Sequence, residues 1–212
     1  MSTHRGFVIS FTLLTAAVAL AGCSSGVKPG SAGNIPSLSF STQSTAPQST
    51  SSSDSSGSTG SAPKVSSPLN PAPLLSDACS GLSASQVSSF GLKTGQPRTI
   101  ETGTTCSWRY NDGTSNTVNI SPLVPNKNGL SDLYDQKDSK AYFEPTQIAG
   151  YPAVYTDIVD SRNRGRCSLY VGVTDQLAVF VFTQLDDGAD VTKPCPVADK
   201  IGAAMVQTLK KG

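Results

Sequence analysis

The cysteines constrain the chemistry of this sequence more than any other residue type. Their number is odd, so at least one of them has no partner for a disulfide within the chain. They lie at positions 23, 79, 106, 167 and 195. A thiol can act as a nucleophile or metal ligand, be oxidised to a disulfide, or carry a lipid. The residues around each cysteine indicate which of these applies.

Cys23 stands at the end of a segment typical of exported proteins. Arg5 makes the start of the chain positive, and residues 7–20 form an uncharged apolar run. A run of about 14 residues is short for a helix across a bilayer core of about 30 Å, and it predicts a secretory signal. Leu20-Ala21-Gly22 before Cys23 resembles a bacterial lipobox. We therefore expect residues 1–22 to be removed and Cys23 to carry acyl chains such as palmitate, which anchor the protein. The alternative is an ordinary signal peptide with an incidental cysteine.

The four remaining cysteines are expected to form disulfides, because export brings them into an oxidising compartment. Four cysteines allow three pairings. A hairpin expected over residues 166–184 returns the chain close to Cys167 shortly before Cys195. This favours the pair Cys167–Cys195 and leaves Cys79–Cys106 as the second pair. The alternative is four free, buried thiols.

Several kinds of chemistry are excluded by what the sequence lacks. His4 is the single histidine, and it lies in the segment expected to be removed. The mature chain therefore has no residue for a Ser-His-Asp or Cys-His mechanism or for a histidine-containing zinc site. Glycine-rich nucleotide-binding motifs are absent, and a net charge of +1 gives no support for nucleic-acid binding. We expect no cofactor and no metal. Glu101 and Glu144 keep carboxylate-only glycoside hydrolysis as an alternative.

An arginine-rich loop is the clearest candidate for ligand binding. It contains Arg162, Arg164 and Arg166. Guanidinium groups suit phosphate or carboxylate recognition, so the loop could bind an anionic envelope polymer or lipid headgroup. The alternative is a solvated loop tip neutralised by aspartates of the loop 185–194, which leaves the same end of the sheet. These aspartates are Asp186, Asp187 and Asp190.

Aromatic residues give a weaker indication of a binding site. Tyr151, Tyr155 and Tyr170 could line a groove, but packing between neighbouring strands would place two of them together equally well. Trp108 alternates with polar neighbours in an expected strand, and we expect it in the core.

The chain divides into three regions. After the signal (1–22), residues 23–75 contain the lipidated cysteine and a Ser/Thr/Pro/Gly-rich tether that is expected to be disordered. Residues 76–212 have the composition of a folded domain. Its helices are expected at 83–90, 132–140 and 196–210, and its strands at about 106–110, 118–120, 152–159, 166–174 and 177–184. This order predicts an α+β fold, in which short helices flank an antiparallel sheet of about five strands. The strand at 177–184 is apolar on both faces, so we expect both to be covered.

The residues over about 76–210 resemble a known family of actinobacterial lipoproteins, the domain of unknown function 3558. The motifs that carry the resemblance are Cys79, Cys106-Ser107-Trp108-Arg109, Gly150-Tyr151-Pro152-Ala153-Val154, Cys167 and Cys195-x-x-Ala198. The resemblance implies an antiparallel sheet with flanking helices, related to the Mog1/PsbP-like fold. It implies no activity and no catalytic residues.

Together these observations predict a lipid-anchored protein on the outer face of the cell membrane. With no catalytic constellation found, we expect a non-catalytic binding or accessory module of the cell envelope. Its partner is expected to be an envelope protein, lipid or glycan. An envelope hydrolase that uses carboxylates alone is the alternative function.

Overall fold

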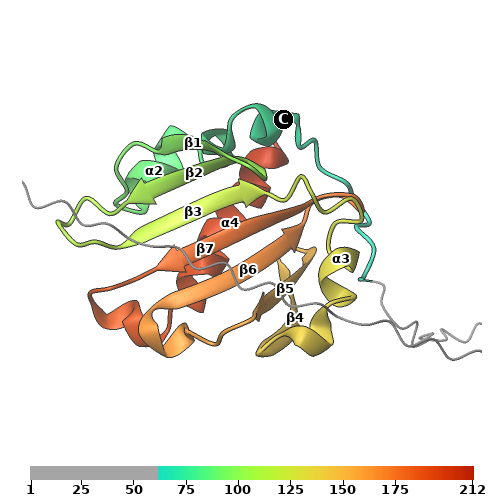
Figure 1. Cartoon of the computed structure of the whole chain (residues 1–212). Helices are drawn as coiled ribbons and strands as arrows, with labels where there is room; N and C mark the ends of the chain where they lie inside the picture. Colours follow the sequence, from blue (N-terminus) through green and yellow to red (C-terminus); the bar gives the residue numbers. More distant parts are fainter. Residues whose placement is uncertain (1–61) are drawn as a thin grey trace, which may run out of the picture. The chain divides into compact units, whose positions relative to one another are not determined.

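A seven-stranded antiparallel sheet organises residues 62–212, the part of the chain that the computed structural model describes (Figure 1). The strand order is β1-β2-β3-β7-β6-β5-β4. The strands are β1 (Gln96–Ile100), β2 (Gly103–Arg109), β3 (Thr117–Pro122), β4 (Tyr142–Ile148), β5 (Tyr151–Asp157), β6 (Arg166–Gly172) and β7 (Ala178–Gln184). With its helices the sheet makes an α+β fold, which is the predicted class.

Helices and single helical turns fill the connections between strands. They are α1 (Ala72–Ser76), α2 (Ala84–Ser89), α3 (Ser131–Tyr134) and α4 (Cys195–Leu209), with 3-10 turns η1 (Ala78–Gly81), η2 (Lys137–Ser139), η3 (Arg162–Arg164) and η4 (Ala189–Thr192). Helix α2 starts with the expected capping box, in which Ser83 and Gln86 each bind the other's backbone N–H. The predicted helix at 132–140 is shorter than expected, because polar residues without an apolar stripe follow Tyr134.

Two strands more than predicted are present, and both lie at the edges of the sheet. Strand β1 contains Pro97 and is exposed along its whole length, while β4 contains Pro145. Proline cannot donate to the hydrogen-bond ladder, so it argues against a central strand but is tolerated at an edge. The strong apolar alternation that identified the central strands is missing from both edge strands, which explains why they were not predicted.

Helix α4 covers one face of the sheet, packing on β6 and β7 (Figure 1). Its buried stripe includes the predicted residues Val197, Ile201, Ala204 and Met205. Across from it, alternate residues of the central strands point into the core. Trp108 belongs to this core, as predicted, with 1% of its surface exposed.

The opposite face, here called the open face, has much less cover from the described helices. Among the described residues, Ala62 and the region around α3 pack on it at one end, where Leu130 and Leu133 meet Val154 and Ala178. The prediction that the strand at 177–184 is covered on both faces is therefore wrong for most of its length. Strand β7 is central, but its open-face residues Phe180 and Phe182 are half-buried.

The packed part of the domain begins before residue 76, the boundary expected from composition. Leu69 donates its backbone N–H to the carbonyl of Val173 at 2.9 Å, and Leu74 of α1 is completely buried. Apolar residues spaced along a proline-rich stretch can be buried without regular periodicity, so composition placed the boundary too late. The predicted signal peptide, Cys23 and most of the predicted tether lie outside the described residues. Within residues 62–212, no helix is long and apolar enough to cross a bilayer.

Candidate functional site

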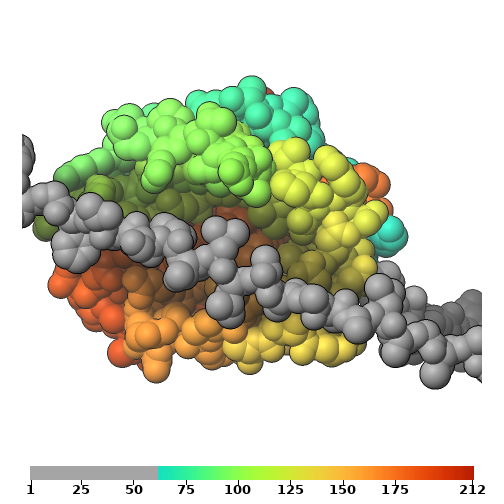
Figure 2. Space-filling model, in the orientation of Figure 1, coloured from blue at the N-terminus to red at the C-terminus, as the bar shows by residue number. Residues whose placement is uncertain are grey.

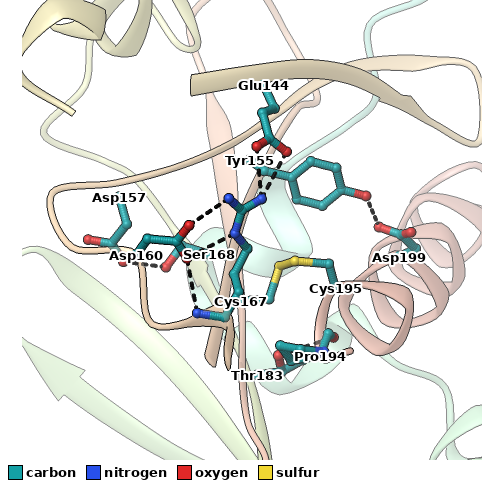
Figure 3. Close-up of a disulfide and its surroundings, with 11 residues drawn as sticks. Glu144, Tyr155, Asp157, Asp160, Cys167, Ser168, Thr183, Pro194, Cys195 and Asp199 are labelled. Atoms are coloured by element: carbon teal, nitrogen blue, oxygen red, sulfur yellow. Dashed lines mark hydrogen bonds and ion pairs between the residues drawn. A yellow bond between two sulfur atoms is a disulfide. The ribbon is translucent and has the colours of Figure 1, made fainter. Parts of the chain in front are cut away.

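Two disulfides fix the framework in which candidate sites must lie, and both have the predicted pairing. Cys79–Cys106 joins η1 to β2, and Cys167–Cys195 joins β6 to the first residue of α4. Figure 3 shows the second bridge between the sheet and the helix. Oxidised cysteines are neither nucleophiles nor metal ligands, so these four residues have a structural role.

Arg162, the first arginine of the predicted anion-binding loop, is occupied by carboxylates of the protein itself. Its Nη1 lies 2.9 Å from both carboxylate oxygens of Glu144, and its Nε and Nη2 donate to Asp160 at 3.0 and 2.7 Å (Figure 3). The guanidinium also lies 4.1 Å from the ring centroid of Tyr142. These hydrogen bonds hold the pKa of Asp160 below its ordinary value. Arg162 therefore stabilises the loop and has no free edge for an external anion.

The other two arginines of this loop do not converge with Arg162. Arg164 donates to the hydroxyl of Ser161 at 2.8 Å, and Arg166 lies within β6, opposite Gln184 of β7. The predicted neutralisation by Asp186, Asp187 and Asp190 is also wrong. The η3 and η4 turns are neighbours, as expected, but among the described residues none of these aspartates forms an ion pair with an arginine. Asp160 and Glu144 were the unrecognised partners, since Glu144 lies in the edge strand that the sequence pattern did not reveal.

The three tyrosines proposed to line a groove lie on different faces. Tyr155 points toward α4, where its hydroxyl donates to Asp199 (Figure 3). Burial, followed by this hydrogen bond, raises the pKa of Tyr155. Tyr151 is buried on the same side and donates to the carbonyl of Ser67 at 2.9 Å. Tyr170 lies on the open face, so no single groove contains all three.

The open face carries an aromatic surface on β6 and β7. The ring of Tyr170 stacks on that of Phe180 with centroids 4.7 Å apart, and Phe180 lies 5.7 Å from Phe182. All three side chains are half-buried. Burial raises the pKa of Tyr170 to about 12, so its hydroxyl is neutral at physiological pH. The tyrosine itself therefore adds no charge to the apolar ring contacts of this surface, although Asp157 lies nearby.

A polar half of the open face adjoins these rings on β2 and β3. Asn119 is paired with Phe182 on one side and with Ser107 on the other. Within residues 62–212, the side chains of Asn119 and Ser107 take part in no hydrogen bond, whereas Ser121 donates to Thr105 nearby. A half-buried amide without an internal partner can bind a ligand, because it has both a donor and an acceptor to offer.

Three arginines surround the same face. In the register of the sheet, Arg109 of β2 and Arg166 of β6 stand in one row, separated by Thr117 and Gln184. Three strand spacings put their backbones about 14 Å apart. Arg98 of β1 lies on the same face, opposite Thr105. Among the described residues, no carboxylate lies within ion-pair distance of any of these three arginines. The open face is therefore basic at its periphery.

Comparison with known families identifies the chain. It matches the family described as "Protein of unknown function (DUF3558)" over residues 18–208. The chain belongs to this family. Comparison with curated proteins and with solved structures finds no match, so the relation to the Mog1/PsbP-like fold stays a prediction.

In this DUF3558 protein, the open face combines three kinds of binding group. Figure 2 shows the molecule from this side, with the β1–β2 part in green at the top and orange and yellow segments at the bottom. Aromatic rings, an amide and a hydroxyl without hydrogen bonds to other described residues, and guanidinium groups without a carboxylate partner among them lie on neighbouring strands. Arg166 and Tyr170 were candidate binding residues in the sequence, whereas Arg109, Asn119 and Phe182 were not recognised as such. The alternation of side chains along each strand indicates which residues share a face of the sheet. The strand order is also needed to show that these residues are neighbours.

No metal site is found among the described residues of this DUF3558 protein. No group of three or more histidine, cysteine, aspartate or glutamate side chains within residues 62–212 has a suitable arrangement.

Proposed function

We propose that this protein is a lipid-anchored, non-catalytic binding module of the cell envelope, and that its open face binds an anionic envelope glycan. The observation that carries the proposal is the juxtaposition of the Phe180–Phe182 aromatic surface with Asn119 and with Arg109 and Arg166, which form no ion pair within residues 62–212. Ring faces provide apolar contact to sugar rings, amides bind hydroxyls, and guanidinium groups bind carboxylate or phosphate. A glycan that carries acidic groups has all three complementary features.

The first residues of the chain support the proposed location. The Leu20-Ala21-Gly22 sequence before Cys23 supports lipidation, and lipid chains would hold the domain on the outer face of the membrane. The two disulfides support an oxidising location, where they would persist. Residues between Cys23 and the folded domain are rich in serine, threonine, proline and glycine, a composition typical of tethers. Such a tether would let the domain reach polymers some distance from the membrane.

The carboxylates of the domain give less support to the alternative of an envelope hydrolase. Glu144 is engaged by Arg162, and Glu101 lies at the exposed end of the β1–β2 hairpin. A general acid needs a raised carboxyl pKa, but the carboxyl pKa values that shift, those of Asp112, Asp160 and Asp175, shift downward. These observations favour binding over acid–base catalysis.

Sedimentation with isolated cell walls tests the binding face. The mature chain without its lipid is mixed with walls at low and high salt, and the bound fraction is measured for two matched variants. Arg109→Glu reverses a charge on the open face, whereas Arg164→Glu makes the same change in the η3 loop. We expect Arg109→Glu to reduce binding strongly, Arg164→Glu to leave it unchanged, and salt to weaken it through screening.

The outcomes of this experiment separate the alternatives. If cell-wall binding is retained in Arg109→Glu but lost in Arg164→Glu, the binding site lies in the arginine-rich loop and not on the open face. Binding lost when the walls are treated with protease would identify a protein partner and contradict the glycan proposal. A separate experiment addresses the anchor: the Cys23→Ala variant should lose the label from a metabolic fatty-acid probe, and retention of the label would contradict lipidation.

A further inference from the structure

A second concave site lies away from the open face, between α2 and β2. This cleft has a volume of about 440 Å³, and its walls come from η1, α2 and the segment 92–95, with Trp108 of β2 among its lining residues. Small-molecule sites typically have volumes of about 300 to 1,000 Å³. The cleft is therefore large enough for a small ligand.

The lining of the cleft has an apolar interior and a polar rim. Leu82 and Leu92 are buried, and Val87 of α2 is half-buried between them and the solvent. Ser88 and Thr94 are exposed at the rim. None of the lining residues carries a charge. Transfer of an ionised group into such a site would cost free energy without a compensating partner, so the lining favours an uncharged occupant.

Trp108 brings its indole N–H to the lining of the cleft. Trp108 is 1% exposed, and no hydrogen bond between residues 62–212 uses its Nε1. An indole N–H can only donate, so this group can serve a ligand that presents an acceptor.

Gly95 keeps the backbone close to this group. A Cβ at residue 95 would lie 2.7 Å from Trp108 Nε1 and 2.6 Å from Cys106 Sγ. Only glycine permits so close an approach, so any larger residue would push the cleft wall away from the indole and the disulfide. Gly95 in the cleft wall, the Trp108 indole and the Cys79–Cys106 disulfide are therefore packed directly against one another.

We propose that this cleft binds a small, uncharged, apolar ligand that presents one hydrogen-bond acceptor, of the chemical class of an alkyl ester. The alkyl part contacts Leu82, Val87 and Leu92, and the ester carbonyl accepts from Trp108 Nε1. The proposal stands independently of the open face, because the two sites share no residues.

The sole tryptophan of the chain makes the test direct, since Trp108 itself lines the cleft. Methyl octanoate is titrated into the mature chain without its lipid, and Trp108 emission is followed. We expect a saturable change in emission with methyl octanoate and a much weaker response to octanoate. The carboxylate of octanoate would have to be desolvated without a cation nearby.

Two neighbouring serines of α2 provide matched variants. Ser88 lines the cleft and Ser89 does not, although both are exposed. Ser88→Phe should fill the cleft mouth and weaken binding by about tenfold or more, which corresponds to about 1.4 kcal/mol. Ser89→Phe should bind like the unmodified protein. Thermal unfolding of both variants establishes that each is folded.

Three results would overturn the proposal: no saturable response to methyl octanoate, equal binding by Ser88→Phe and Ser89→Phe, or equal binding of ester and carboxylate. If Ser88→Phe unfolds, Ala84→Leu is the second cleft variant, and unchanged affinity in it has the same meaning. Because Trp108 reports only on its own surroundings, failure here leaves the glycan proposal intact.

Discussion

The guanidinium Nη1 of Arg162 lies 2.9 Å from both carboxylate oxygens of Glu144. This contact joins the η3 turn to the edge strand β4, two segments 18 residues apart in sequence. Asp160 binds the other side of the same guanidinium at 2.7 Å. The sequence suggested that the arginines of this loop either bind a ligand or face the aspartates of the 185–194 loop. The geometry instead gives Arg162 a structural role in holding β4.

Arg162→Gln is therefore expected to lower the free energy of unfolding by about 1 kcal/mol, because partly exposed ion pairs contribute about 0 to 1 kcal/mol each. Arg164→Gln should change stability by less than about 0.5 kcal/mol. Urea unfolding measures both. The pKa of Asp160 is lower in the folded state, so its contribution is present above the ordinary carboxyl pKa and is lost as pH falls below about 4. The difference in the free energy of unfolding between wild type and Arg162→Gln should accordingly become smaller in acid. A difference that grows in acid would contradict this assignment.

Tyr170 should make the fold sensitive to alkali. Its pKa is raised to about 12, first by burial and then by the charge of Asp157. Because the pKa of Tyr170 is higher in the folded than in the unfolded protein, its neutral form contributes to stability. This contribution is fully present below the unfolded-state pKa of about 10 and is lost as the pH rises toward the folded-state value. Tyr170→Phe should recover about 1 to 3 kcal/mol of the stability lost between about pH 10 and 12. Tyr134→Phe, in the short helix α3, should recover less. Equal recovery by both variants, measured by urea unfolding at each pH, would argue against burial at Tyr170.

The predictable part of the fold is the part with strong side-chain alternation. Strands such as β6 and β7 place apolar residues such as Leu169 and Val181 in the core at every second position, and that pattern can be read directly. Strand β1 has no buried residue, and its pairing depends on hydrogen bonds to β2 alone. Such a strand leaves no hydrophobic signal in the sequence. The α+β class and the disulfide pairing could be predicted because they depend on the central strands.

The candidate sites were less predictable, because they depend on strand order. Phe182 and Asn119 are 63 residues apart in the sequence, and they are neighbours only because β7 pairs with β3. Nothing local to either residue indicates that pairing. Trp108 was correctly expected in the core, but the free indole N–H and the cleft beside it require the placement of α2. Burial and the disulfide pairs could therefore be predicted from the sequence, whereas contacts between strands distant in sequence required the strand order.

Gly165 should be among the least replaceable residues of the loop region. It has a φ of +79°, and a Cβ there would lie 1.8 Å from the carbonyl oxygen of Leu185. Its own carbonyl accepts the N–H of Leu185 at 2.8 Å, which joins the η3 loop to the start of the 185–194 loop. We expect Gly165→Ala to lower the free energy of unfolding by about 3 to 5 kcal/mol, since both conformation and contact are violated.

Gly188 is the matched control for this substitution. Its φ is +96°, but a Cβ at this residue would have no atom of the described chain within 4 Å, so only backbone strain is added. Gly188→Ala should cost about 1 to 2 kcal/mol in the same chemical unfolding experiment. If the two variants were equally destabilised, the close contact with Leu185 would not matter.

The two disulfides should contribute similarly to stability but differently to the surroundings of Trp108. They close loops with sequence separations of 27 and 28 residues, so loss of either should cost about 3.5 kcal/mol by chain entropy. Cys79 lines the cleft beside Trp108, and its partner Cys106 lies two residues from the tryptophan in β2. The double variant Cys79→Ala/Cys106→Ala should therefore release η1 from the sheet, admit water to the indole and shift Trp108 emission to the red. Cys167→Ala/Cys195→Ala should destabilise the protein to a similar extent while leaving the emission of the folded protein unchanged, because that bridge lies between β6 and α4. Emission spectra recorded below the unfolding transition test this difference. A red shift in both variants, or in neither, would show that the Cys79–Cys106 bridge does not support the cleft.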